Sequence, residues 1–266
     1  MARVRVDRDA RGVVTCWLDN AERRNALTDG MLAMLAGVVE DATARAVILR
    51  GANGTFCSGR DLRELDASGV DSDAALASRI EPVQRLAAAV RGCKVPTVAV
   101  VQGKAAGLGV ALASWCDFVL AETEASFAIP EARAGVAPSF TAVSLVRAIG
   151  RAAALDLCLS GRAAGAVEAA SFGLVQRVIA PGRLDEEVRA LADSLCNGSP
   201  QALAACKSLL AATAASTLDD AIAQAAAAAV ISMRSSDAAE GMRAFRDKRP
   251  PRWAAAQESR TWPAHA

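Results

Sequence analysis

Pro96-Thr-Val-Ala-Val-Val-Gln-Gly-Lys-Ala-Ala-Gly-Leu-Gly-Val110 joins a short apolar run to a loop of small residues. The run from Thr97 to Val101 predicts a strand that is covered on both faces. The segment from Gly107 to Trp115 predicts a helix, whose first amides are unpaired and lie at the positive end of its dipole. Neither G-x-x-x-x-G-K-S/T nor G-x-G-x-x-G is present, so nucleotide binding of either common kind is disfavoured.

A second loop of small residues reads Gly51-Ala-Asn-Gly-Thr-Phe-Cys-Ser-Gly-Arg-Asp-Leu62. It follows another wholly apolar run, Ala46 to Leu49, and a helix is predicted to begin near Asp61. Such a loop lets a ligand approach the backbone closely and directs free N–H groups at an acceptor oxygen. A glycine-rich turn that only reverses the chain explains the same residues.

A third segment, Phe127-Ala-Ile-Pro-Glu131, places a carboxylate after a proline at the end of a short apolar strand. On its own, Glu131 fits a first-turn helix residue that favours the dipole. Together, two amide-rich loops and one carboxylate at strand ends of one α/β unit are able to converge on a carbonyl. Paired backbone donors stabilise a developing oxyanion, and losing one donor costs on the order of 3 kcal/mol.

Strands alternating with helices up to about Ala180 predict an α/β architecture, and the pattern beyond Pro181 is wholly helical. Thr28 is expected to cap a helix that runs to about Glu40. The other predicted strands are Arg3 to Arg8, Val13 to Leu18 and Val119 to Leu120, and the predicted C-terminal helices are Leu184 to Leu195, Pro200 to Thr213, Leu218 to Met233 and Asp237 to Phe245.

Composition narrows the class of protein. The chain has 266 residues, 53% of them hydrophobic, and a formal net charge of +1. These values suit one sizeable globular domain and give no field that would attract nucleic acid or an anionic membrane. No apolar run reaches the roughly 20 residues that cross a bilayer. The first residues alternate like a strand and not like a signal peptide, so we expect a soluble, cytoplasmic protein with no membrane or nucleic-acid partner.

The rarer residue types exclude several chemistries. The seven cysteines are widely spaced without a C-x-x-C pair, and we expect buried reduced thiols instead of a metal site or disulfides. The single histidine is His265, at the end of the chain, and there is no tyrosine. Ser-His-Asp, Cys-His and zinc chemistry therefore lack their usual residues. Any catalysis must depend mainly on carboxylates and backbone amides.

At these residues the sequence resembles the crotonase superfamily, also called the enoyl-CoA hydratase/isomerase family. The match runs from about Val4 to Trp253, and six motifs stand in the expected order. They are Arg24-Asn-Ala-Leu27; Phe56-Cys-Ser-Gly-Arg-Asp-Leu62, similar to F-x-x-G-x-D-L/I; Pro96 to Gly103 with Ala106-Gly-Leu-Gly109; Cys116-Asp117; Pro130-Glu131; and Glu240-Gly-Met-Arg-Ala-Phe-Arg-Asp-Lys-Arg249.

The resemblance implies a spiral of β-β-α turns in residues 1–198, forming the catalytic core that binds acyl-CoA. It implies a helical region in residues 199–266 that serves trimer formation, often as a dimer of trimers. Coenzyme A is then part of the substrate, and no further cofactor or metal is expected. By position, the backbone amides of Arg60 and Leu108 would hold the thioester oxygen. The residues implied to line the substrate and coenzyme site are Arg23, Arg24, Ala26, Ser58, Gly59, Asp61, Leu62, Gly107 and Pro130, with Phe245 and Lys248 from the C-terminal region, sometimes of a neighbouring subunit.

Two departures from the family pattern bear on the reaction. Hydratases of this family typically use two glutamates around one water, but the first position here is Ala111 and only Glu131 remains. A methyl group cannot hold or deprotonate water, whereas one carboxylate can still move a proton along the chain, so isomerisation and hydration of an enoyl-CoA both stay open. Phe140 stands near a usual glycine-rich turn and would reshape the acyl pocket. Lyase, dehalogenase or decarboxylase chemistry, or non-catalytic acyl-CoA binding, are the alternatives. Asp117 is expected to be structural.

Overall fold

The computed structural model describes residues 2–41, 43–64, 72–214 and 216–254. Its larger sheet has six strands in the order β1-β2-β3-β4-β6-β9. Only β1 and β2 are antiparallel; the other neighbours run parallel. The strands are β1 Arg3–Arg8, β2 Val13–Asp19, β3 Ala46–Gly51, β4 Thr97–Val101, β6 Phe118–Glu122 and β9 Arg177–Ile179.

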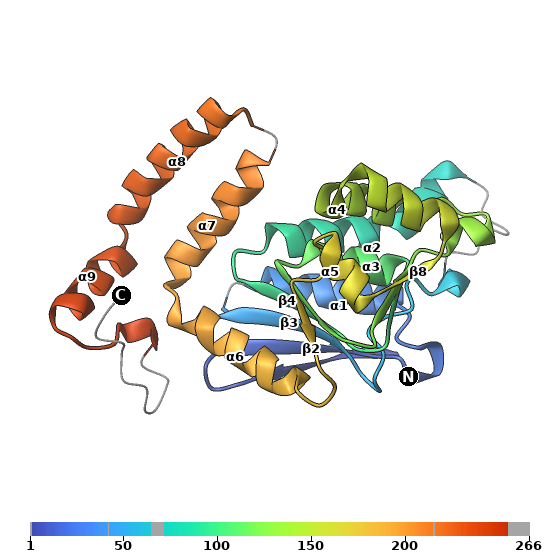
Figure 1. Ribbon diagram of the computed structural model, residues 1–266, viewed down its shortest axis with the longest axis horizontal. Helices are drawn as coiled ribbons and strands as arrows, with labels where there is room; N and C mark the ends of the chain where they lie inside the picture. The colour runs from blue at the N-terminus through green and yellow to red at the C-terminus, as the bar shows by residue number, and fades with distance from the viewer. Residues whose placement is uncertain (1, 42, 65–71, 215, 255–266) are drawn as a thin grey trace.

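Both faces of this sheet are covered, which explains the unbroken apolar runs of the central strands. All five residues of β4 are buried. On one face, Val47, Leu49, Ala99 and Val101 pack into a core with α1 (Asp29–Glu40), α2 (Asp73–Gly92) and α3 (Leu108–Trp115). On the other face, Ile48, Val98 and Val100 pack against α6 (Leu184–Asn197), which crosses beneath the sheet in Figure 1.

A smaller sheet has the order β5-β7-β8, with β5 Lys104–Ala106, β7 Ser126–Ala128 and β8 Ala163–Gly165. The chain alternates between the two sheets: β4 is followed by β5 and α3, and β6 is followed by β7 and α4 (Ser139–Ser160). After β8, α5 (Ala166–Ser171) leads to β9. The predicted β-β-α turns are therefore present, and each turn delivers a strand end of the small sheet to the same neighbourhood.

The C-terminal helices form an arm. α7 (Pro200–Thr213) and α8 (Leu218–Met233) pack against each other and extend away from the two sheets, with α9 (Ser236–Arg246) at the far side from α4 (Figure 1). A lysine in the middle of α7 ties the arm to the larger sheet, because Lys207 Nζ donates to Asp117 Oδ2 at 2.5 Å and to the Val95 carbonyl at 2.7 Å. Within the described ranges, no helix is both long enough and apolar enough to cross a membrane.

The structure corrects one prediction and supplies elements that the pattern did not show. Among the residues described around Asp61, no α-helix begins: Leu62–Glu64 form a single 3-10 turn, and α2 begins at Asp73. α2, α4 and α5 were not predicted. α4 is broken at Gly150, where φ is 78° and ψ 166°, which are not helical values. By contrast, Thr28 caps α1 as expected, because its side chain accepts from the Met31 amide. His265 lies outside the described residues.

Candidate active site

The two loops of small residues are hydrogen-bonded to each other. The Cys57 amide donates to the Lys104 carbonyl at 3.1 Å, and the Ala106 amide donates to the Cys57 carbonyl at 2.8 Å. The fit is too tight for a side chain at Gly109, since a Cβ there would lie 2.5 Å from the Cys57 carbonyl oxygen. The first loop is thus held as an extra extended segment beside β5, as its bridge to Ala105 shows.

This pairing brings the two predicted oxyanion donors into one place. Gly59, with a φ of +106°, directly precedes Arg60, and a Cβ on Gly59 would lie 3.5 Å from the Leu108 nitrogen. Within the described part of the chain, neither the Arg60 amide nor the Leu108 amide donates a backbone hydrogen bond. Leu108 is the first residue of α3, where an unpaired N–H is expected. Two free amides next to each other can hold one carbonyl oxygen.

The third segment joins the same place through β7. The Gly107 amide donates to the Ala128 carbonyl at 2.9 Å, so the chain reaches Glu131 three residues beyond a strand that is tied to the second loop. Glu131 begins a 3-10 helix, Glu131–Ala134, after Pro130 at its N-cap. The helical reading of its backbone was therefore correct. Its carboxylate, however, lies against the Cα of Gly107, since a Cβ there would be 2.6 Å from Oε1.

The two carboxylate oxygens of Glu131 have different surroundings. Its Oε1 accepts a bond from Thr141 Oγ1 at 3.5 Å, while Oε2 is buried and has no partner among the described residues. Burial raises the pKa of this carboxyl, because desolvation disfavours the charged form, although the hydrogen bonds that it accepts lower the pKa again. A carboxyl with a raised pKa beside two free amides is a typical acid–base group.

Ala111 is completely buried on α3. The segment Leu108–Trp115 contains no ionisable side chain, so α3 brings no second carboxylate to Glu131. Within the described residues, Glu131 is the carboxylate that lies against Gly107, at the start of α3.

The side chain of Arg60 points away from these amides and fixes the loop. Its guanidinium donates to the Leu27 carbonyl at 2.9 Å and to Glu64 at 2.8 Å, and it also pairs with Asp29. Asp61 is buried and pairs with Arg63 at 2.6 Å, which lowers the pKa of Asp61 to about 2. Both side chains thus hold the shape of the loop, whatever the loop binds.

The residues expected at the coenzyme site form a rim beside the first loop. The Ser58 amide donates to the Arg24 carbonyl, and the Ser58 hydroxyl donates to the Arg23 carbonyl at 2.8 Å. Arg23 and Arg24 are exposed, and no ion pair of either is found in the described ranges. Ala26 is buried beneath them, and Leu62 is exposed. The structure therefore brings these residues together at one surface.

Two asparagines that the sequence did not single out build this rim. Asn25 is fully buried with a φ of 59°, and its side-chain amide donates to the carbonyls of Ala52 and Thr55 at 2.8 and 2.7 Å. Its side-chain oxygen accepts from the amide of Asn20, whose own side chain donates to the Ala26 carbonyl. The motif Arg24-Asn-Ala-Leu27 contained the signal, because asparagine tolerates left-handed backbone and bonds nearby peptides.

Phe245 and Lys248 are not brought to this site within one chain. Phe245 is 78% exposed on α9, and Lys248 follows it with a φ of 52°. In Figure 1, α9 lies at the opposite end of the molecule from α4, whose first turn contacts Glu131. Asp117, in contrast, is engaged structurally, because it accepts from the Thr97 amide at 2.7 Å and from the Thr97 hydroxyl at 2.9 Å, besides Lys207.

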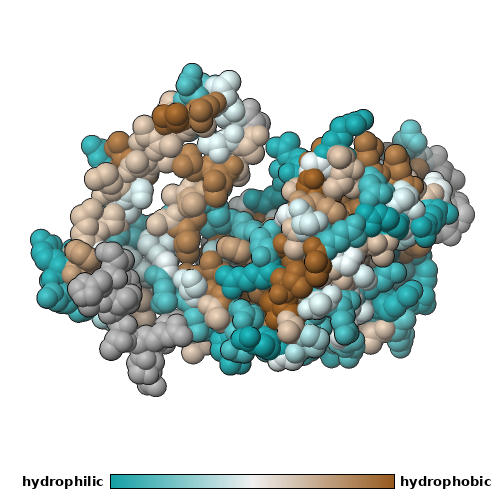
Figure 2. All heavy atoms as spheres, viewed as in Figure 1, coloured by the Kyte–Doolittle hydropathy of each residue, from teal (hydrophilic) through white to brown (hydrophobic). Residues whose placement is uncertain are grey.

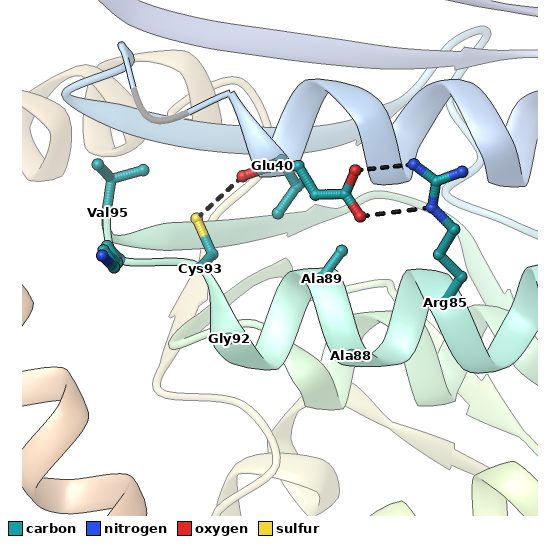
Figure 3. Close-up of a pocket in the computed structure, with 9 residues that line it drawn as sticks. Glu40, Arg85, Ala88, Ala89, Gly92, Cys93 and Val95 are labelled. Atoms are coloured by element: carbon teal, nitrogen blue, oxygen red, sulfur yellow. Dashed lines mark hydrogen bonds and ion pairs between the residues drawn. The ribbon is translucent and has the colours of Figure 1, made fainter.

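Two hollows lie away from the convergent loops. One, of about 470 Å³, lies between the ends of α1 and α2, where the carboxylate of Glu40 meets Arg85 (Figure 3). None of the predicted site residues lines it. The other, of about 410 Å³, is lined by Trp115, Phe140 and Val143, among others. Phe140, which precedes Thr141 on the first turn of α4, thus lines this second hollow.

Comparisons with known proteins agree with this architecture. The family model described as enoyl-CoA hydratase/isomerase matches residues 8–256. A putative enoyl-CoA hydratase of Thermus thermophilus is 37% identical over 246 residues, covering 91% of this chain and 97% of that protein. A crystal structure of an enoyl-CoA hydratase of Mycobacterium smegmatis superposes with a TM-score of 0.87 at 33% identity, over 94% of this chain and 98% of that one. An enoyl-CoA hydratase/isomerase of Marinobacter aquaeolei gives a TM-score of 0.88 at 26% identity, over 94% and 98% of the two chains.

The fold is thus that of the crotonases, a class of α/β proteins built from β-β-α turns. The chain belongs to the enoyl-CoA hydratase/isomerase family.

Proposed function

We propose that this protein is an enzyme that acts on an enoyl-CoA thioester, stabilises its enolate with two backbone amides and uses Glu131 as its single acid–base residue. The observation that supports this most strongly is the position of the Glu131 carboxylate. Its carboxylate lies against Gly107, the residue before the free Leu108 amide, and one of its oxygens is buried without a partner. The family provides the substrate class, since relatives that cover most of this chain are named enoyl-CoA hydratases.

The proposed isomerisation is a balanced proton shuttle. Glu131 removes a proton from the carbon next to the thioester carbonyl, and the electron pair of that C–H bond moves toward the carbonyl oxygen. The Arg60 and Leu108 amides donate to this oxyanion. Glu131 then returns the proton two carbons further along the chain, and the double bond moves into conjugation. General acid–base transfer of this kind contributes roughly 100- to 10,000-fold, and an oxyanion hole is usually the larger contribution.

Hydration is the second outcome that the site permits. It adds the elements of water across the 2,3-double bond, and Glu131 would both activate the water and supply the proton. Ala111 provides no second group to hold that water, and this favours isomerisation. No metal or further cofactor is required by either reaction, because coenzyme A enters as part of the substrate.

Coenzyme A is proposed to lie along the rim at Ser58 and Ala26, with Arg23 or Arg24 near its phosphates. Both arginines are exposed at that rim, where guanidinium groups bind phosphate well. Phe245 and Lys248 would serve this site only from a neighbouring subunit, since α9 is remote within one chain.

A trimer, or a dimer of trimers, is therefore part of the proposal. None of the residues of α7 and α8 is buried, although Leu210, Ile222 and Ile231 are large apolar residues with 59 to 73% of their surface exposed. Figure 2 shows apolar surface at the outer end of this arm, where the α7–α8 turn lies in Figure 1. Apolar surface of this kind marks interaction sites in soluble proteins.

Product analysis tests the reaction. Purified protein is incubated with hex-2-enoyl-CoA or hex-3-enoyl-CoA. The products are separated by liquid chromatography, which distinguishes the two isomers, and are identified by mass spectrometry. Interconversion of the two isomers supports the isomerase; 3-hydroxyhexanoyl-CoA would show that hydration proceeds despite Ala111. Glu131→Gln should abolish either reaction while coenzyme A binding persists. If neither product forms with these or with branched and longer thioesters, lyase, dehalogenase or decarboxylase chemistry, or a binding role, takes precedence.

A further inference from the structure

Thr141 is the third residue of α4, so the carbonyl four residues earlier, that of Ala137, lies outside the helix. Hydroxyl side chains further along a helix have a helical carbonyl within reach. Such side chains commonly bond the carbonyl four residues earlier. Ser144 and Ser160 on the same helix do so, donating to the carbonyls of Phe140 and Asp156, each at 2.6 Å. Among the described residues, the Thr141 hydroxyl has one hydrogen-bond partner, Oε1 of Glu131 at 3.5 Å. The Thr141 hydroxyl, which has no such carbonyl within its own helix, therefore has the Glu131 carboxylate as its acceptor.

Burial makes this contact selective. Thr141 is 2% exposed, on the first turn of α4, and its branched side chain has few rotamers available. A buried hydroxyl needs a partner, and the carboxylate is the one that it finds. The helix start is held by the Ala142 amide, which donates to the Pro138 carbonyl at 2.7 Å. The backbone at the start of α4 therefore holds Thr141 in position, and the Thr141 hydroxyl in turn holds the Glu131 carboxylate.

The two oxygens of Glu131 differ as a result. Oε1 lies between Thr141 and Gly107, where an added Cβ would be only 2.6 Å away. Oε2 lies farther from that Gly107 position, at 3.4 Å, and is buried without a partner. One oxygen thus has a hydrogen-bond donor beside it, and the other has none among the described residues.

We propose that Thr141 is a positioning residue that anchors Oε1 of Glu131, so that Oε2 is the atom that takes and returns the substrate proton. This deepens the proposed function and rests on it. In the resting site the hydroxyl supports the ionised carboxylate, because a hydrogen bond to the charged form favours it. It thereby opposes the upward effect of burial on the pKa of Glu131.

Few other ionisable groups act on this carboxyl. Cys158 lies on the second half of α4. Burial raises the pKa of its thiol, and the nearby Glu131 raises it further. Arg133, in the same 3-10 helix as Glu131, donates instead to the Ser160 carbonyl at 2.9 Å. α3 carries no charged residue, and neither do β7 and β8. A change of pH profile in a Thr141 variant therefore reports mainly on the lost hydroxyl.

The test compares Thr141→Val, which keeps the branched shape without the hydroxyl, with Thr141→Ser, which keeps the hydroxyl. With hex-3-enoyl-CoA, Thr141→Val should lower kcat on the order of threefold, because the 3.5 Å contact is longer than an ordinary O–H···O bond, with KM changed less than about twofold. Its acidic limb of kcat/KM should move to higher pH. Thr141→Ser should restore both. Thr141→Ala gives a second hydroxyl-free protein, with the same upward shift expected, if the valine variant folds poorly.

Thr97→Val is the matched control, because it removes another buried hydroxyl that donates to a carboxylate, that of Asp117, away from the site. It should lose stability but keep the wild-type pH profile. An unchanged profile and kcat in folded Thr141→Val, or a serine variant that behaves like it, would overturn the proposal. Glu131→Gln separates the two ideas: if it stays active, the proposed function fails, and if it is inactive while Thr141→Val matches wild type, only the role of Thr141 fails.

Discussion

Gly107→Ala is the change that tests the geometry of the site most severely. Gly107 has φ 50° and ψ −120°, a conformation that side chains with a Cβ rarely adopt, at a cost of about 1–3 kcal/mol. The added methyl would also lie 2.6 Å from Oε1 of Glu131, whereas ordinary contact begins at 3.4 Å. The carboxylate must therefore move by about 0.8 Å, and a displacement of about 1 Å at a reacting group can cost roughly 100-fold in rate.

The assay is hydrogen–deuterium exchange at the carbon next to the carbonyl of hex-3-enoyl-CoA, followed by mass spectrometry, with isomerisation recorded in parallel. We expect both rates to fall by roughly 100-fold, while the affinity for coenzyme A stays within about threefold because the rim at Ser58 is untouched.

Gly173→Ala is the control, since Gly173 also has a positive φ, of 87°, but an added Cβ there meets nothing within 4 Å. It should cost stability and leave the rate unchanged. If Gly107→Ala folds and works at the wild-type rate, the carboxylate beside Gly107 is not the group that moves the proton.

Three further outcomes follow from the structure. Asn25→Ala removes a fully buried side chain that holds two carbonyls and one amide, so it should lower the free energy of unfolding by about 2–4 kcal/mol in urea titrations and weaken coenzyme A binding. Activity should have an acidic limb above the ordinary glutamate pKa of 4.5, because burial raises the pKa of Glu131 and the base must be ionised; a limb at or below that value in wild type would contradict this. Glu240 pairs with Arg249, and this pairing lowers the pKa of the Glu240 carboxyl to about 2. The ion pair should therefore stabilise the fold fully above pH 4.5 and lose its effect as the pH falls toward 2. In Glu240→Gln, the free energy of unfolding should depend less on pH over that range.

Most of the fold could be read from local patterns. Apolar runs identified β3 and β4, because a strand that is covered on both faces is apolar at nearly every position. The cap at Thr28 and the boundaries of α7 and α8 followed from residue type alone. α2 was missed because Pro82 stands inside it and only Val83, Leu86 and Val90 of its 20 residues are buried, so no wide apolar face marks the helix. Its composition is that of a largely solvated helix.

The site was predicted less completely, for a different reason. The free amides and Glu131 each follow a strand, so strand order placed them at a common end. The contacts that give them their properties are non-local. Thr141 bonds Glu131 from the next helix, and Asn25 bonds the Thr55 carbonyl 30 residues away. Neither bond can be predicted from the spacing of residues along the chain. The helix predicted near Asp61 was wrong for the described residues, where Asp61 pairs with Arg63 and Leu62–Glu64 form a 3-10 turn.

Exchange of the α-hydrogens of hex-3-enoyl-CoA in heavy water tests most directly whether Glu131 moves the proton of an enolate held by two amides. The wild type is compared with Glu131→Gln at equal coenzyme A occupancy. We expect the wild type to incorporate deuterium into hex-3-enoyl-CoA and the variant to incorporate none above the uncatalysed rate, with unchanged coenzyme A affinity. Incorporation by Glu131→Gln at the wild-type rate would contradict this expectation.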